Sequence, residues 1–108
     1  MATRILVANF SISGGSRVII PYNFNLEYPV SINELTIYTD NNFMFNFRVV
    51  GSTKWFATDL MRNDAIFFGV IPFRFPKPFE LPARTGIEID FYSTAGANGQ
   101  IIFIGYEL

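Results

Sequence analysis

The segment that most constrains the fold is the closing stretch, residues 101–108, which carries large apolar side chains on both of its faces. Successive side chains of a strand point to opposite faces, so Ile101 and Phe103 share one face while Ile102 and Ile104 share the other. Neither face can be turned to water without exposing branched aliphatic groups. Such a strand is typical of the centre of a sheet, or of a sheet with one face against another protein.

The residues before this segment have the pattern of a strand with one wet face. In residues 86–92, apolar side chains alternate with Glu88, Asp90 and Tyr92, which is the period of two expected for a half-buried strand. The small residues 96–99 lie between the two segments and favour a tight turn. We therefore expect residues 86–108 to form a β-hairpin whose tip is at residues 96–99.

Six or seven short extended segments separated by turn residues run along the chain, which is typical of a β-sandwich or barrel. We expect strands over residues 4–12, 17–27, 30–38, 43–50, 54–58 and 65–71. In the third of these the apolar period changes phase, so a bulge near Asn33 and Glu34 is expected. Asp40, Asn41 and Asn42 predict a turn that closes a hairpin onto residues 43–50.

Two other stretches predict irregular structure. Residues 59–64 are expected to form one helical turn capped by Asp59. Residues 72–82 contain four prolines, which forbid a helix, so we expect an extended segment along a sheet edge with its aromatic rings inward and its backbone unpaired. The 108 residues suit one domain, and we predict that residues 1–108 form a single all-β, antiparallel β-sandwich.

The composition lacks the side chains on which most catalysis depends. There is no cysteine and no histidine, which removes thiol nucleophiles, zinc-thiolate sites and the usual general base near neutral pH. Asp40, Asn41 and Asn42 offer oxygen ligands for calcium, but no further acids follow at loop spacing. We predict that the chain is not an enzyme and that it holds no cofactor and no metal.

Charge and hydropathy exclude two classes of partner. The net charge is −1, which gives no positive footprint for nucleic acid. The uninterrupted apolar runs are far shorter than the ~20 residues that a membrane helix needs. We therefore expect no nucleic acid and no membrane as a partner, and synthesis in the cytosol, since no segment resembles an export signal.

The chain has more apolar residues than one small fold is expected to hide. Hydrophobic residues make up 50% of it and charged residues 16%, against about 25% charged in a typical domain. The surplus indicates contact with a protein partner or with copies of the chain itself. The expected contacts lie in residues 2–6, in residues 72–82 and on the outer face of residues 101–108. The candidate interface residues are Ile5, Phe73, Phe75, Pro76, Pro78, Phe79, Ile101 and Phe103.

Two sugar-related alternatives rest on particular side chains. Glu88 and Asp90 place two carboxylates on one strand face at about the spacing of a glycosidase pair, but we interpret them as an ordinary solvated face. Trp55 with the tyrosines is the second alternative, a stacking platform of a carbohydrate-binding sandwich. The tyrosines concerned are Tyr22, Tyr28, Tyr38, Tyr92 and Tyr106.

The end of the chain resembles a known group of proteins. The approach Phe79-Glu-Leu-Pro82, the following Thr85-Gly-Ile-Glu-Ile-Asp-Phe and the closing Ile101-Ile-Phe-Ile-Gly-Tyr-Glu-Leu108 are similar to the ending of small structural proteins of tailed bacteriophages, which include accessory head and tail proteins and capsid decoration (cement) proteins. The resemblance covers roughly the last third of the chain. It implies a jelly-roll-like sandwich in the virion, often a trimer, that binds the major capsid protein or another virion structural protein and carries no cofactor.

Overall fold

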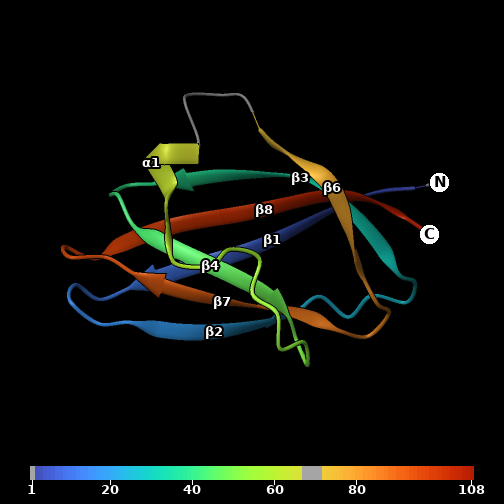
Figure 1. Ribbon diagram of the computed structural model, residues 1–108, viewed down its shortest axis with the longest axis horizontal. Coiled ribbons are helices and arrows are strands. Elements are labelled where there is room, and N and C mark those ends of the chain that lie inside the picture. The colour runs from blue at the N-terminus through green and yellow to red at the C-terminus, as the bar shows by residue number, and fades with distance from the viewer. Residues whose placement is uncertain (1, 67–71) are drawn as a thin grey trace.

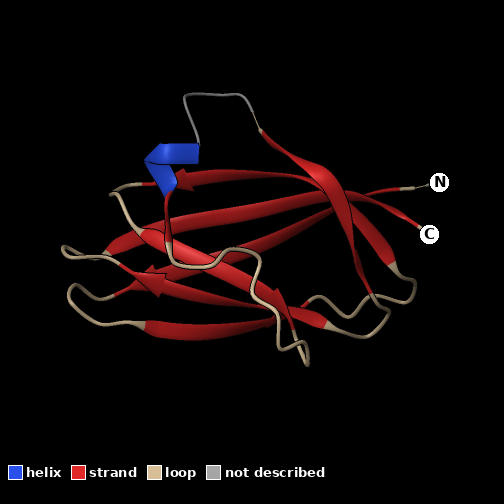
Figure 2. Cartoon of the chain, viewed as in Figure 1, coloured by secondary structure: helices blue, strands red, loops and turns tan. Residues whose placement is uncertain are grey.

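The computed structural model describes residues 2–66 and 72–108, which form two four-stranded antiparallel sheets packed face to face (Figures 1 and 2). The elements are β1 (Thr3–Ile12), β2 (Val18–Asn23), β3 (Val30–Thr39), β4 (Met44–Val49), β5 (Met61–Arg62), α1 (Asn63–Ile66), β6 (Phe73–Leu81), β7 (Gly86–Tyr92) and β8 (Ala97–Glu107). Within the described ranges, α1 is the single helix. The prediction of an all-β antiparallel sandwich is confirmed.

The strand order follows a simple rule. Sheet A has the order β1-β8-β3-β6 and sheet B the order β2-β7-β4-β5. The first strand pairs with the last, the second with the second to last, and so on inward along the chain. The pairs are β1 with β8, β2 with β7, β3 with β6, and β4 with β5. Two more pairings, β3 with β8 and β4 with β7, join these pairs into sheets. The chain is thus one long double strand rolled up so that successive pairs alternate between the two sheets.

The core between the sheets is built from the inward side chains of both. In β1 the inward positions Leu6, Ala8, Phe10 and Ile12 are buried while their neighbours are exposed. Phenylalanine rings fill the middle, and among the described residues Phe47 of β4 has the most ring neighbours. Its ring lies within 6.4 Å, centroid to centroid, of the rings of Phe45, Phe56, Phe75, Phe79 and Phe103. One apolar core therefore joins the two sheets.

The strand β8 lies inside sheet A, between β1 and β3. Its residues Ile101 and Phe103 are fully buried in the core, whereas Ile102 and Ile104 lie on the outer face and are half-buried. This confirms the central position that the two apolar faces predict. It also leaves an apolar stripe on the outside of the sheet.

Both predicted hairpins are wrong. β7 lies in sheet B and β8 in sheet A, so residues 86–108 cross between the sheets. The turn at Asp40 likewise leads from β3 in sheet A to β4 in sheet B. The two crossings pack together, since the Asn98 amide donates a hydrogen bond of 2.7 Å to the Asp40 carboxylate. Turn residues indicate that the chain reverses, but not whether the returning strand pairs or crosses to the facing sheet.

The proline-rich segment forms β6 at the edge of sheet A, as its prolines predict. Its backbone is not unpaired, however. It pairs with β3 at both ends, through Leu81 and Glu80 at one end and Arg74 and Phe73 at the other, and skips the middle. The skipped stretch faces the irregularity between Ile32 and Glu34, where the predicted bulge is confirmed.

Residues 51–66 differ most from the expectation. No strand forms over residues 54–58, and the helical turn lies at α1 rather than at residues 59–64. The Asp59 carboxylate accepts a hydrogen bond from the Leu60 amide instead of capping α1. Residues 67–71, which include most of the strand expected over 65–71, lie outside the described residues.

Candidate functional site

The outer face of sheet A carries an apolar strip across its two neighbouring strands β1 and β8. Ile5 lies opposite Ile104, Val7 opposite Ile102, and Thr3 opposite Tyr106. The exposed fractions are 63% for Ile5, 39% for Val7 and 44% for Tyr106. We define the apolar strip as Ile5, Val7, Ile102, Ile104 and Tyr106. It is a contiguous patch of aliphatic and aromatic groups open to solvent, the kind of surface that marks interaction sites.

Polar groups border the apolar strip on two sides. Towards the far end of the strands, the Gln100 amide donates a hydrogen bond of 2.8 Å to the Asn9 side-chain oxygen. Towards the β6 edge, Arg74 forms an ion pair with Glu34, with 3.2 Å between Nη2 and Oε1. An apolar centre with a polar rim is the usual anatomy of a protein interface.

Only part of the predicted interface lies at the surface. Ile5 belongs to the apolar strip, but Phe75, Ile101 and Phe103 are buried in the core at 4%, 0% and 0% exposure. They pack within the chain itself and do not present a surface to a partner. The outer face of residues 101–108 was expected to make contacts, but it carries Ile102 and Ile104 and not the named Ile101 and Phe103. A strand that is apolar on both faces does not reveal which face is inward.

The remaining predicted interface residues lie on β6, at the edge of sheet A. Pro76 and Pro78 are exposed, and Phe73 and Phe79 are half-buried against the core. The Phe79 ring lies 5.7 Å from that of Phe47, centroid to centroid. The prolines thus face solvent while the rings point inward, so this segment adds little apolar surface outside the fold.

The outer face of sheet B is held by ion pairs. Arg17 binds both carboxylate oxygens of Asp90, with Nη2 2.6 Å from Oδ2, and this hydrogen bonding raises the pKa of Arg17. Asp90 is only 4% exposed, so it is not the solvated residue that the sequence pattern predicts. Arg48 binds Glu88 across the strand pair at 3.1 Å. Each of the two carboxylates is therefore engaged by an arginine.

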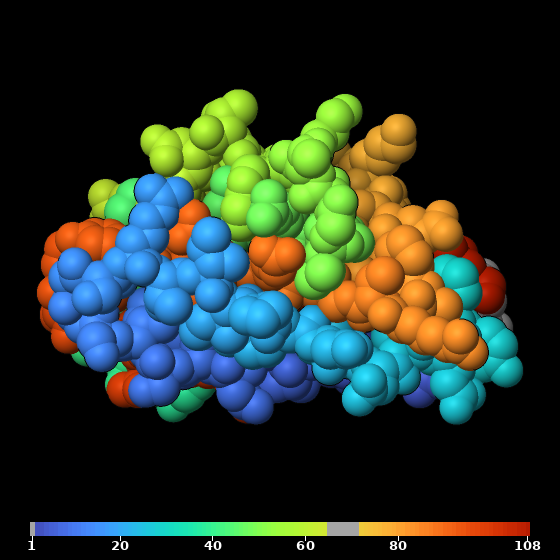
Figure 3. All heavy atoms as spheres, turned by 90° about the horizontal axis from the view of Figure 1, so that it is seen from below, coloured from blue at the N-terminus to red at the C-terminus, as the bar shows by residue number. Residues whose placement is uncertain are grey.

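Trp55 stands at this same face, beside a groove of about 360 Å³. The Arg48 guanidinium lies 4.4 Å from the centre of the Trp55 ring, a cation–π contact. Asn46 and Asp90 line the groove with Trp55. Figure 3 shows the segment 51–60, in yellow-green, standing beside the light-blue β2, with orange β7 between them. The tyrosines do not gather here; Tyr38 and Tyr106, for example, lie on sheet A.

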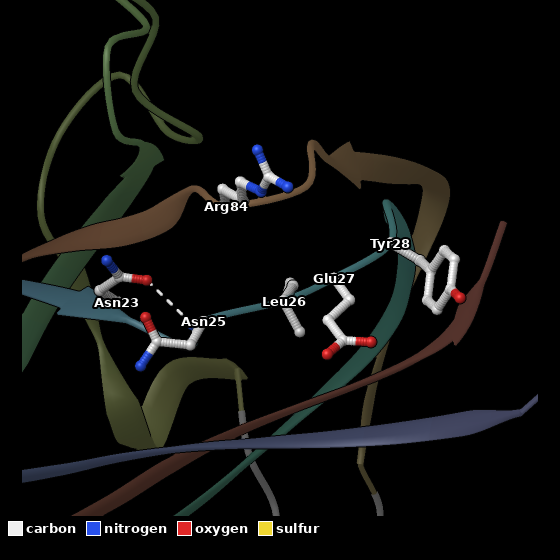
Figure 4. Close-up of a pocket in the computed structure, with 6 residues that line it drawn as sticks. All are labelled: Asn23, Asn25, Leu26, Glu27, Tyr28 and Arg84. Carbon is white, nitrogen blue, oxygen red and sulfur yellow. Dashed lines mark hydrogen bonds between the residues drawn. The ribbon is translucent and has the colours of Figure 1, made fainter.

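A larger polar cavity of about 540 Å³ lies at the end of the sandwich (Figure 4). Residues of the β2–β3 connection form one wall and Arg84, from the β6–β7 turn, forms the other. Asn25 and Arg84 have positive φ angles of 51° and 60°, an uncommon conformation for residues other than glycine. The Arg84 amide donates to the Leu26 carbonyl at 2.9 Å, so the two turns hold each other in place.

No family model, no curated protein and no solved structure matches this chain. In residues 2–66 and 72–108 there is no helix long and apolar enough to cross a membrane. The same ranges contain no group of three or more acidic residues, histidines or cysteines placed to hold a metal ion. The geometry of the chain itself is the basis for assigning a function.

Proposed function

We propose that this chain is a jelly-roll structural protein of a tailed bacteriophage, which binds the capsid shell as a decoration protein. The strand order supports the fold assignment. A jelly roll has eight strands in two sheets, arranged as two Greek keys, and it is common in viral capsid and lectin domains. The pairing of β1 with β8, β2 with β7, β3 with β6 and β4 with β5 matches a rolled double strand of this kind.

The observation that carries the functional proposal is the apolar strip on sheet A. Exposed Ile5, Val7 and Tyr106 flank half-buried Ile102 and Ile104, and polar groups border the strip on two sides. Aromatic residues at such a centre often supply much of the binding energy. A protein that strengthens a shell needs shallow apolar contacts repeated by symmetry, and an apolar sheet face on a small rigid sandwich suits that task.

The wider assignment follows from the same proposal. The chain is made in the host cytoplasm and acts in the virion, its partners being the major capsid protein or another virion structural protein and copies of itself. The resemblance of its ending to phage proteins favours a trimer. Because Arg17 and Arg48 engage the acidic pair on sheet B, the proposal assigns those acids to stability and no catalytic role to the chain.

Immunogold electron microscopy tests the proposal. Antibodies raised against the purified protein are applied to purified phage particles from cells that carry the gene. Gold on the heads of intact particles is the expected result. Gold confined to the tails would refute the binding to the capsid, and particles without gold would refute the virion assignment altogether.

Matched tyrosine variants test whether the apolar strip makes the contact. Tyr106→Ser alters the strip, whereas Tyr28→Ser alters the cavity of Figure 4; the two residues are 44% and 54% exposed. Each purified variant is added to particles of a phage whose copy of the gene has been deleted, so that the particles lack this protein. The amount of variant that sediments with the particles is then measured. We expect weaker binding only for Tyr106→Ser. A loss confined to Tyr28→Ser would move the contact to the cavity.

The groove beside Trp55 supports a second candidate, a carbohydrate-binding module. A half-buried indole beside the amide of Asn46 and the Arg17-bound carboxylate of Asp90 combines an aromatic ring with polar groups, the side-chain types that stack on and hydrogen-bond sugars. A glycan array tests it, with Trp55→Ala as the site variant and Phe56→Ala as the neighbouring control. Binding that is lost in Trp55→Ala alone would favour this candidate, and an array without signal would exclude it.

A further inference from the structure

Three of the four sheet edges in the described part of the chain are protected against pairing with another strand. β2 contains Pro21, β5 has only two residues, and β6 contains Pro76, Lys77 and Pro78. Prolines, lysines and short strands are the usual means by which proteins block an edge. The fourth edge, β1, has ten residues, no proline, no lysine and an unbroken register with β8. It is the edge left open to an added strand.

The backbone N–H and C=O groups of successive β1 residues point alternately toward β8 and toward the open edge of the sheet. The Ala2 carbonyl accepts a hydrogen bond from the Glu107 amide, so the even-numbered residues bond to β8 and the odd-numbered ones point outward. At Asn9 the outward carbonyl is already occupied, because the Tyr22 hydroxyl donates to it at 2.7 Å. The open part of the edge is therefore Thr3, Ile5 and Val7, and this series ends where β2 begins to cover β1.

We propose that β1 of a second copy of this chain pairs with this open edge, antiparallel and about a two-fold axis at Ile5. Only this register uses all three open residues of both copies. Ile5 then faces Ile5 of the other copy, and Thr3 of each copy faces Val7 of the other. Each such pair exchanges two backbone hydrogen bonds, so the contact contains about six of them and joins two sheets A into one continuous eight-stranded sheet.

The surroundings of the edge are suited to this partner. Residues 4–6 line a cavity of about 460 Å³ together with the segment 24–28 and Glu107, so the chain's own side chains do not fill the space beside this part of β1. Arg4 forms an ion pair with Glu107 within its own chain, which limits repulsion between the two copies. The side chains of Ile5 and Val7 would extend the apolar strip across the axis, and an isologous contact of this kind is the commonest in homo-oligomers.

Single-cysteine variants test the register, because the natural chain has no cysteine. The variants are Thr3→Cys, Ile5→Cys, Val7→Cys and, as a control on the other sheet, Ile19→Cys, whose isoleucine is 48% exposed. Under mild oxidation Ile5→Cys should form disulfide-linked dimers at least about tenfold faster than the other three, since paired strands hold the two sulfurs at about millimolar effective concentration. Equal rates for all four, or equal rates at positions 3, 5 and 7, would overturn the proposal.

A proline variant tests the backbone hydrogen bonds directly. Ile5→Pro removes an outward N–H while leaving the bonds to β8 in place, and Ile5→Thr keeps the N–H but makes the side chain polar. Sedimentation equilibrium of the folded variants should give a weaker dimer for Ile5→Pro than for Ile5→Thr. A dimer that is as strong in Ile5→Pro as in Ile5→Thr, or an unmodified chain that is monomeric at high concentration, would refute the pairing.

The pairing of β1 with a second copy would serve the proposed assembly function, and its biological role rests on that function. The pairing itself is tested on the isolated chain. A failure of β1 pairing would leave the immunogold result unchanged. Unlabelled particles, in turn, would leave the disulfide rates unchanged. The two-fold contact joins copies in pairs, whereas the resemblance to phage proteins favours a trimer. A trimer that forms no disulfide through position 5 would therefore overturn the two-fold contact.

Discussion

Replacing Phe47 with alanine should lower the free energy of unfolding by about 4 kcal/mol. The side chain is 2% exposed, and its ring lies within 6.4 Å, centroid to centroid, of five other phenylalanine rings. Burial of ~150–250 Å² of aromatic surface at ~25 cal/mol per Å² corresponds to ~4–6 kcal/mol. Alanine keeps part of that burial, so the expected loss falls in the ~3–5 kcal/mol range of phenylalanine-to-alanine changes in cores.

Such a loss is a large share of the ~5–15 kcal/mol that stabilises a typical domain, and it should lower Tm by about 15–30 °C. Phe56→Ala is the matched control. The Phe56 ring stacks on Phe47 at 4.6 Å between centroids but is 42% exposed, so its removal should cost about half as much or less. Both variants lose the stacking between the two rings, so the difference between their losses of stability reports the burial of Phe47.

Urea unfolding measures both changes, with the fluorescence of Trp55, the single tryptophan, and circular dichroism as independent probes. Coincident transitions from the two probes would establish two-state unfolding. Equal losses for Phe47→Ala and Phe56→Ala, or a loss below about 1 kcal/mol for Phe47→Ala, would refute the placement of this ring at the sealed centre of the core.

Three further predictions concern pH and packing. Burial raises the pKa of Tyr22 from 10.0 to about 12, so the stability from its neutral form is fully present below pH 10 and is lost as pH rises towards 12; thermal melts across this range should show a smaller alkaline loss in Tyr22→Phe. Hydrogen bonds from Asn98 lower the pKa of Asp40 below 3.8, so its contribution is present above that pH and is lost during acidification; Asp40→Asn should show a shallower acid loss in the same melts. A Cβ at Gly105 would lie 2.0 Å from the Ser31 carbonyl oxygen, and Gly105→Ala should therefore cost about 1–3 kcal/mol in urea unfolding, whereas an unchanged midpoint would contradict the strand spacing.

Several features of the fold were predictable because they depend on local periodicity. In the strand expected over residues 4–12, alternation alone puts Leu6, Ala8, Phe10 and Ile12 on one face, and those side chains are buried. The change of phase near Asn33 correctly indicated the bulge in β3. Side-chain alternation is a property of each strand by itself, so it can be derived without knowledge of any partner strand.

The pairing of strands was not predictable in the same way. The turns at Asp40 and at residues 96–99 were expected to close hairpins, yet each carries the chain from one sheet to the other. A hairpin and a crossing need the same backbone reversal, and the choice depends on which surface the next strand buries. The candidate site depended on this choice, because β8 presents Ile102 and Ile104 outward only once β1 and β3 flank it.

The sequence by itself determined that this chain is extended, apolar beyond the average and without the side chains of common catalysis. It also predicted a contact at Ile5, whose side chain is exposed in the structure. Only the tertiary structure decided that Ile101 and Phe103 face the core and that β1 is an edge strand of sheet A. The physical reason is that burial and edge exposure are relations between strands distant in the chain, whereas composition and periodicity are properties of each segment alone.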